Sequence, residues 1–316
     1  MSILCTLREN LSTTDNMPEQ EKGVITKGVG GVFTVRCDDG SMRLCQIRGN
    51  LRLKKMTPLV GDKVITGDSG DPDIPFVLEK ILPRKNFLIR PPLANLDTLL
   101  LVFACADPVP DLKLLDKMLI ISGTLKIDPV ILFTKSDKDS QACDKLVKIY
   151  KDAGFPCFAI TKDEPVSDEI RSYFGRGLTG LAGPSGVGKS TFCNNILGEG
   201  TMKVGDISDR LKRGKHTTRH AELFEFGEGF ITDTPGFTSL DLFEVGVLYT
   251  DVAGGYPEIR RASSECKFAD CRHIAEKQCR VRELIGNGID EGRYTRYREF
   301  YEYLYSRRPN SAGGYK

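Results

Sequence analysis

A glycine-rich segment at residues 183–190 has the residue types and spacing of a phosphate-binding loop. It reads Gly-Pro-Ser-Gly-Val-Gly-Lys-Ser, satisfies G-x-x-x-x-G-K-S/T, and lies between a predicted strand (179–182) and a predicted helix (189–197). Glycines let backbone N–H groups surround phosphates, and a helix N-terminus adds positive potential. We expect Lys189 to reach the β- and γ-phosphates and Ser190 to bind Mg²⁺. The predicted nucleotide contacts here are Gly183, Pro184, Ser185, Gly186, Val187, Gly188, Lys189, Ser190 and Thr191.

The phosphate loop alone does not distinguish ATP from GTP. A second motif could do so by recognising the base. Residues 134–137, Thr-Lys-Ser-Asp, follow an apolar segment, and GTPases carry an N/T-K-x-D loop after a buried strand. Its Asp accepts hydrogen bonds from guanine N1–H and the exocyclic amine, and opposite adenine a buried Asp137 would lack a partner. Backbone at the end of the next predicted strand could contact guanine O6. The predicted guanine contacts are Thr134, Lys135, Ser136, Asp137, Ile160 and Thr161.

The order of these two motifs is unusual. In most GTPases the base loop follows the phosphate loop, whereas here it precedes it. Strand–helix units can be reordered in a chain while the sheet and its binding edge stay intact, because domain termini often lie close together. The order therefore predicts a circularly permuted P-loop domain.

Two further segments could sense the γ-phosphate. Residues 230–236, Phe-Ile-Thr-Asp-Thr-Pro-Gly, form a predicted strand running into D-x-x-G. Asp233 would bind Mg²⁺ through its water shell, and the N–H of Gly236 would contact the γ-phosphate. Upstream, either Thr217 or Thr218 could complete the Mg²⁺ coordination; the alternative is a threonine pair in an ordinary basic loop.

The residue after Gly236 is Phe237, at a position where Ras-like enzymes have a glutamine that orients water. An aromatic ring cannot orient water by hydrogen bonding, so intrinsic hydrolysis should be slow. His216 is the nearest candidate for the missing group, although a single histidine among basic residues is more often a surface residue.

A cysteine–histidine cluster near the C-terminus has the spacing of a metal site. Its pattern is C-x4-C-x-H-x5-C, and three thiolates with one imidazole complete a tetrahedral, structural Zn²⁺ site. A chance clustering of buried cysteines is the alternative. Lys and Arg outnumber Asp and Glu from Arg260 onward, which suggests that the module binds a phosphate backbone. The predicted zinc ligands are Cys266, Cys271, His273 and Cys279.

The elements that must position these residues form three predicted domains. Residues 21–82 hold short strands separated by turns, including Asp39-Gly40, and favour a small barrel, with the OB-fold as the leading candidate among barrels of this size. After a linker at 83–94, strands alternate with helices over 95–240, which predicts a doubly wound α/β sheet. Residues 245–305 are mostly helical around the cluster. Residues 1–20 and 306–316 are predicted tails.

Composition agrees with an ordinary soluble, cytoplasmic protein. Of 316 residues, 40% are hydrophobic and 28% charged, the N-terminus lacks the pattern of a secretory signal, and the apolar run at 99–106 is too short to cross a bilayer. The net charge is +2, so the whole chain does not indicate nucleic-acid binding. Ten cysteines without a secretion signal argue against a disulfide scaffold.

Together these motifs resemble the RsgA (YjeQ) family of circularly permuted GTPases. The resemblance covers roughly residues 21–305 and includes RGNLR, VGDKV and LPRKNFLIRPPLANLD in the first domain and linker. It departs at Thr134, where many members have Asn. It implies an OB-fold, a GTPase domain and a zinc domain, and a GTPase that binds the 30S subunit and its 16S rRNA late in maturation. GTP or GDP, Mg²⁺ and one structural Zn²⁺ are the implied cofactors, and a monomer without membrane contact is the expected form.

Two other functions remain compatible with the motifs. The first is an rRNA-binding assembly factor whose nucleotide site is not catalytic, against which intact Lys189, Ser190 and Asp233 argue. The second is an ATPase of the transporter type, which shares GPSGxGKST but has no use for T-K-x-D and carries an LSGGQ-like segment that is absent here. D-x-x-G lies directly before the zinc module, so we also expect γ-phosphate loss to relax Gly236–Leu240 and reorient residues 245–305.

Overall fold

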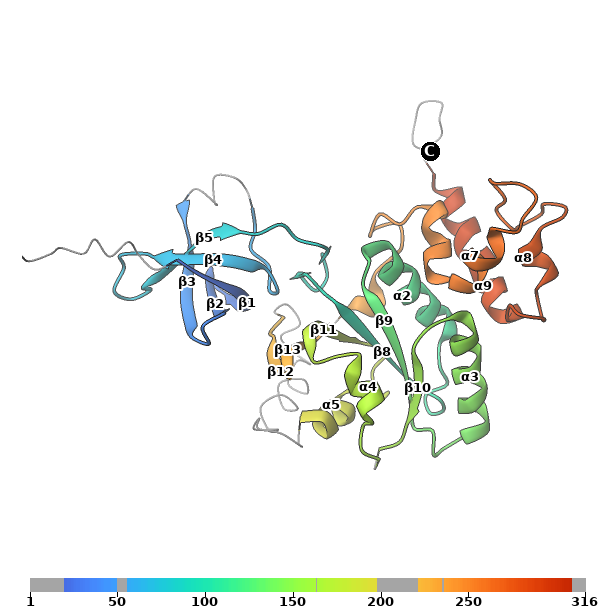
Figure 1. Cartoon of the computed structure of the whole chain (residues 1–316), viewed down its shortest axis with the longest axis horizontal. Helices are drawn as coiled ribbons and strands as arrows, with labels where there is room; N and C mark the ends of the chain where they lie inside the picture. Colours follow the sequence, from blue (N-terminus) through green and yellow to red (C-terminus); the bar gives the residue numbers. More distant parts are fainter. Residues whose placement is uncertain (1–19, 50–55, 163, 198–220, 235, 309–316) are drawn as a thin grey trace, which may run out of the picture.

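The computed structural model describes residues 20–49, 56–162, 164–197, 221–234 and 236–308. Three parts follow one another along the chain: a β-barrel, a helix-covered sheet and a group of helices (Figure 1). The multidomain α/β architecture predicted from the sequence is thereby confirmed. None of the helices in these ranges combines the length and apolar character needed to cross a bilayer.

Five strands close the N-terminal barrel in the order β1-β2-β3-β5-β4. They are β1 (Glu21–Val29), β2 (Val32–Cys37), β3 (Met42–Ile47), β4 (Lys63–Asp68) and β5 (Phe76–Ile81). Inward side chains such as Ile25, Val35 and Leu78 are fully buried, because alternate residues of a barrel strand face its interior. The predicted turn at Asp39-Gly40 joins β2 to β3, and Gly40 has a φ of 93°, a value that favours glycine.

A short hairpin of β6 (Phe87–Leu88) and β7 (Leu93–Ala94) lies inside the predicted linker. The Asn86 amide donates to Leu96 O at 2.8 Å, and Asn95 Nδ2 donates to Gly61 O at 2.9 Å. Both amides are buried, so leaving either unpaired would cost free energy. The hairpin is therefore fixed to the barrel and to the start of the central sheet.

Six strands form the central sheet in the order β10-β9-β8-β11-β13-β12, with parallel pairing except between β12 and β13. The strands are β8 (Thr98–Ala104), β9 (Asp128–Thr134), β10 (Cys157–Ile160), β11 (Arg176–Ala182), β12 (Phe224–Phe226) and β13 (Glu228–Asp233). The helices between them are α2 (Leu112–Leu125), α3 (Ser140–Ala153), α4 (Asp168–Ser172) and α5 (Lys189–Leu197). The predicted doubly wound sheet is present.

Both faces of this sheet are buried. Along β8, Leu99, Leu101 and Phe103 pack in one apolar cluster with α2 and α3, whereas Leu100 and Val102 pack in another with α4 and α5. Successive side chains of a strand point to opposite faces. A strand covered by helices on both faces therefore has a continuous apolar sequence, and that apolar run predicted this strand.

The C-terminal part is helical, as predicted. Its elements are η2 (Tyr249–Gly255), α7 (Pro257–Ser263), α8 (Arg280–Glu283) and α9 (Glu291–Ser306). Figure 1 places them beside α2 and α3, and their buried side chains continue the apolar cluster on that face of the sheet. The C-terminal part thus shares a core with the central domain.

A buried ionic network joins α9 to α2. Asp116, fully buried on α2, accepts hydrogen bonds at 2.6 Å from Arg293 and at 2.5 Å from Arg296. The Tyr150 hydroxyl donates to the same carboxylate at 2.9 Å, and Arg293 also pairs with Glu258 at 2.6 Å. Burial alone would lower the pKa of Arg293, but Asp116 and Glu258 outweigh it and raise that pKa. The guanidinium therefore stays charged.

Candidate nucleotide and metal sites

The phosphate loop connects the end of β11 to the start of α5, as the sequence predicted. Gly183, Gly186 and Gly188 have φ angles of 151°, 79° and 96°, a region that side chains rarely enter. A Cβ on Gly183 would lie 2.0 Å from Val102 O. Only glycine fits there, so the loop passes directly beside β8 with its backbone available for phosphates.

Lys189, the first residue of α5, turns back over the loop. Its Nζ donates to Gly183 O at 2.8 Å and to Pro184 O at 2.7 Å. Burial lowers the pKa of Lys189, while Asp233 acts to raise it. Burial also raises the pKa of Asp233, which Lys189 opposes. The two predicted residues thus influence each other's charge, although they come from different strand–helix units.

The base loop is attached to the phosphate loop by Thr134. This buried residue ends β9, and its hydroxyl lies 2.5 Å from Val187 O and 3.3 Å from Phe103 O. Lys135 follows with a φ of 58°, and its ammonium donates to Asp107 O. The two motifs therefore contact each other despite their inverted order in the chain.

One cavity of about 210 Å³ contains residues of both motifs. Residues from the base loop, from the end of β10 and from the phosphate loop and α5 face it together. A larger cavity, about 570 Å³, lies between α3 and residues 286–291 and includes none of the predicted residues. The smaller cavity is lined by Thr134, Lys135, Asp137, Lys138, Ile160, Thr161, Lys162, Val166, Gly188, Thr191, Phe192 and Asn195.

The D-x-x-G segment follows β13 at the same edge of the sheet. Asp233 ends the strand, and Gly236 is exposed with a φ of 84°. Phe237 is fully buried, so its ring belongs to the core and cannot face an attacking water. The predicted residues His216, Thr217 and Thr218 lie outside the described part of the chain.

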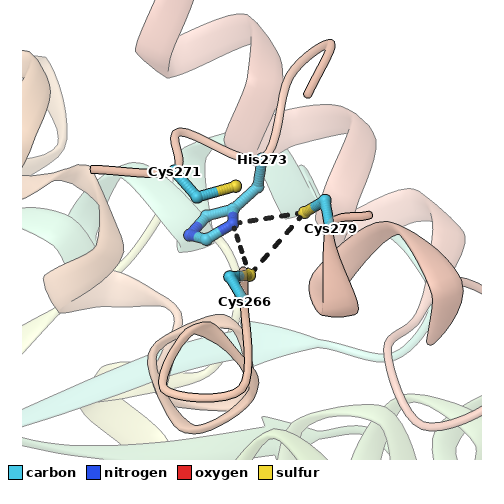
Figure 2. A group of neighbouring side chains, drawn as sticks. All are labelled: Cys266, Cys271, His273 and Cys279. Atoms are coloured by element: carbon cyan, nitrogen blue, oxygen red, sulfur yellow. Dashed lines mark hydrogen bonds between the residues drawn. The ribbon is translucent and has the colours of Figure 1, made fainter. Parts of the chain in front are cut away.

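Four side chains of the C-terminal cluster converge, as Figure 2 shows. The ligand atoms of Cys266, Cys271, His273 and Cys279 all lie within 4.8 Å of one another. His273 Nδ1 is 3.6 Å from Cys266 Sγ and 3.4 Å from Cys279 Sγ, and these two sulfurs are 3.9 Å apart. Ligands of a tetrahedral Zn²⁺ at usual bond lengths are separated by about 3.5–3.8 Å. The geometry fits such an ion.

A side chain of α9 supports the backbone of this cluster. His273 has a φ of 61°, and its carbonyl accepts a 2.8 Å hydrogen bond from the Tyr294 hydroxyl. Burial lowers the pKa of His273, which favours the neutral imidazole that metals bind. The four residues can therefore hold a metal ion.

We expect the purified protein to contain one Zn²⁺ per chain, and its removal to lower Tm by about 10 °C, because a structural ion contributes to folding in a chain of this size. Elemental analysis and thermal unfolding, before and after chelation, measure both. Restoring Zn²⁺ to the chelated protein should restore the original Tm. A metal-free preparation with the same Tm would contradict the assignment.

Several residues of the nucleotide cavity had not been predicted. Asn195 lies one helical turn after Thr191, and its amide donates to Lys162 O at 2.9 Å. The four-residue spacing on α5 could have indicated it, since residues i and i+4 share a helix face. Lys138 pairs with Asp107 at 2.7 Å, and no spacing in the sequence indicated that it lines the cavity.

A disulfide is the feature of this region that differs from the sequence interpretation. Cys105, after β8, is bonded to Cys143 of α3, although the sequence argued against a disulfide scaffold. Both residues are buried, and Cys105 N also donates to Thr134 O at 2.9 Å. The two cysteines are thirty-eight positions apart in the chain, so only the fold brings them together.

Comparison with known proteins gives consistent matches. The RsgA GTPase model matches residues 81–243, and the RsgA N-terminal domain model matches residues 22–69. The small ribosomal subunit biogenesis GTPase RsgA of Carboxydothermus hydrogenoformans is 40% identical, over 90% of this chain and 98% of that protein. Its namesake in Clostridium novyi is 39% identical, over 89% and 94%.

Two solved structures are also similar. YloQ, described as a circularly permuted GTPase, superposes with a TM-score of 0.77 at 30% identity and covers 94% of this chain and 99% of its own. YjeQ from Thermotoga maritima gives a TM-score of 0.75 at 28% identity, with coverage of 92% and 100%. The inverted order of the two loops therefore occurs in known structures of the same architecture.

Proposed function

The chain belongs to the family of RsgA GTPases and is a GTP-hydrolysing enzyme, and from this premise we propose that it acts in the late maturation of the small ribosomal subunit. The names of its relatives support this role, since they are small ribosomal subunit biogenesis GTPases. We propose that the subunit stimulates hydrolysis, because Phe237 is buried where a water-orienting side chain would be needed.

The assignment of the nucleotide site rests on the cavity that residues of both loops line. Asp137 and Gly188 line the same space, so a nucleotide with its base at Asp137 would have its phosphates at the phosphate loop. We propose that Thr134, Lys135, Ser136 and Asp137, with the backbone of Ile160 and Thr161, contact guanine. The phosphates are assigned to residues 183–191, above all to Lys189.

The remaining assignments concern Mg²⁺ and the catalytic step. Ser190 and Asp233 would hold a Mg²⁺ ion, which neutralises charge on the phosphates. Gly236 is exposed at the same edge of the sheet, and its N–H is assigned to the γ-phosphate. Thr217, Thr218 and His216 remain candidates for the last Mg²⁺ ligand and for the group that orients water.

The partner and cofactor assignments rest on the C-terminal part and the barrel. We propose that the four-residue cluster binds Zn²⁺, and that the barrel (21–82) and the zinc domain (245–305) contact 16S rRNA while residues 95–240 hydrolyse GTP. Lys267, Arg272 and Lys277, which lie between or next to the cluster residues in sequence, are exposed basic residues, which suits a phosphate backbone. A cytoplasmic monomer is the form we propose.

Replacing Asp137 tests the guanine assignment. The Asp137 carboxylate is exposed at the cavity, where it can accept from guanine N1–H and the exocyclic amine. Inosine nucleotides lack that amine. We expect Asp137→Ala to weaken GTP binding by about a hundredfold, since hydrogen bonds to a charged group are lost, and to make GTP and ITP bind equally. Competition against a fluorescent guanine nucleotide measures both affinities.

Asp144→Ala is the matched control for this test. Asp144 is an exposed carboxylate on α3 outside the cavity, so the variant should bind GTP and ITP as the wild type does. If Asp137→Ala still prefers GTP to ITP by the wild-type ratio, the base binds elsewhere.

A further inference from the structure

The segment after Gly236 is held in place by side chains from two helices. Its first turn, η1, spans Phe237–Ser239 and directly follows Gly236, the residue assigned to the γ-phosphate. Phe237 and Leu240 are buried in the core, which fixes the inner side of the segment. Its polar side is met by Lys117 of α2 and by Tyr303 of α9.

Lys117 binds the main chain of this segment directly. Its Nζ donates a 2.9 Å hydrogen bond to Thr238 O, two residues beyond Gly236. Burial lowers the pKa of Lys117, whereas Asp241 and Asp111 act to raise it. A lysine that gives up hydration and rotamer freedom needs a partner to offset the cost. The Thr238 carbonyl and the nearby Asp241 charge supply it.

Tyr303 holds the same segment through Asp241. The Tyr303 hydroxyl donates to the Asp241 carboxylate at 2.7 Å, and the Phe243 N–H donates to it at 2.8 Å. Burial acts to raise the pKa of Asp241, but these hydrogen bonds outweigh it and lower that pKa. Asp241 therefore stays ionised and fixes the end of the segment.

The helices that supply these contacts are themselves fixed to each other. Asp116, next to Lys117, holds Arg293 and Arg296 of α9. Buried charges of this kind resist separation, because a lone charge would remain in the core. Helices α2 and α9 thus form a rigid support against which residues 236–241 are placed.

We propose that Lys117 is a positioning residue for GTP hydrolysis: by holding Thr238 O, it sets the position of Gly236 relative to the γ-phosphate. Tyr303 supports the same placement through Asp241. The inference rests on the proposed function, in which the Gly236 N–H contacts the γ-phosphate. The proposal predicts a selective effect. GDP has no γ-phosphate to contact Gly236, so the affinity for GDP should not change when Lys117 is replaced.

Lys117→Met tests this role because it removes the donor and keeps an unbranched side chain. We expect the affinity of the full-length protein for GDP to stay within about twofold of wild type. Affinity for a non-hydrolysable GTP analogue, and the hydrolysis rate at saturating GTP, should each fall about tenfold, as for loss of one charged hydrogen bond. Lys117→Arg, which can still donate to Thr238 O, should restore most of both. Fluorescence titration and single-turnover hydrolysis give these values.

Two further variants keep the test decisive. Lys113→Met, one turn earlier on α2, removes a lysine that faces Glu299 instead of the segment, and should leave both affinities unchanged. Tyr303→Phe should reduce binding of the GTP analogue about threefold, and it decides the matter if Lys117→Met does not fold. Equal effects on GDP and the analogue, or none, would overturn the role of Lys117. Failure of the wild type to bind guanine nucleotides would overturn the proposed function instead.

Discussion

Lys189→Ala is expected to reduce the rate of GTP hydrolysis at saturating GTP by about a thousandfold, the order of loss seen when one preorganised donor to a transition state is removed. The Lys189 ammonium already sits inside the phosphate loop, bonded to Gly183 O and Pro184 O. It is therefore in place to stabilise the charge that develops on the transferred phosphoryl group. Single-turnover hydrolysis with and without small ribosomal subunits measures the loss.

Lys148→Ala provides a control with the same change of residue type. Lys148 is exposed on α3, where its charge pairs with Asp152 one helical turn away, and such surface pairs contribute little. This variant should hydrolyse GTP at the wild-type rate. If Lys189→Ala keeps its fold by circular dichroism yet loses less than about tenfold in rate, the phosphate loop is not the catalytic centre.

Arg293→Met is expected to lower the free energy of unfolding by about 3–5 kcal/mol, because removing one member of a buried ionic network leaves the others uncompensated. Asp116 and Glu258, both buried, would each lose a guanidinium partner at 2.6 Å. Arg296 would still contact Asp116, so the effect should not exceed this range. Urea unfolding followed by circular dichroism gives the free energy.

Arg298→Met, on the same helix, separates this effect from a general effect of losing charge on α9. Arg298 is half-exposed and pairs with Glu302, so its replacement should change the free energy of unfolding by less than about 0.5 kcal/mol. Equal small changes in the two variants would show that the network does not stabilise the interface. Hydrogen exchange should locate the loss in Arg293→Met to α9 and α2.

Much of the central fold was predictable because its strands are uninterrupted apolar runs. Thr98–Ala104 is buried along its whole length, which only a strand covered on both faces requires. The strand before D-x-x-G was also predicted, although β13 starts at Glu228 and not at Phe230, because Glu228 and Gly229 pair with Arg176 and Gly177 of β11. Pairing across the sheet, not local preference, set that boundary.

The site was predictable where a motif combines fixed spacing with fixed chemistry. The cysteine–histidine pattern predicted a convergent cluster, and the structure brings its four side chains together. The contacts between distant segments left no such pattern. Asp116 and Arg293 are separated by 177 positions, and neither a lysine at position 117 nor a tyrosine at position 303 differs in type from an ordinary helical surface residue.

The ionic network also bears on how the zinc domain would respond to hydrolysis. The sequence suggested that relaxation of Gly236–Leu240 reorients residues 245–305, and this stays a prediction. Arg293 and Arg296 hold those residues to Asp116 of α2. Any reorientation must therefore carry α2 with it or break the buried pairs, and breaking them would leave uncompensated charges in the core.

The strand order has a consequence for biosynthesis. Of the central sheet, β8, β9 and β10 with their helices emerge first during translation, and they form one contiguous half of the sheet. The β11 strand, which pairs with both β8 and β13, emerges later and must add to the open side of β8. Domains generally fold as units, the N-terminal ones first, as the chain leaves the ribosome. A nascent chain would thus contain the proposed guanine-binding loop before the proposed phosphate-binding loop has been synthesised, so an incomplete chain could neither bind nor hydrolyse GTP in the proposed way.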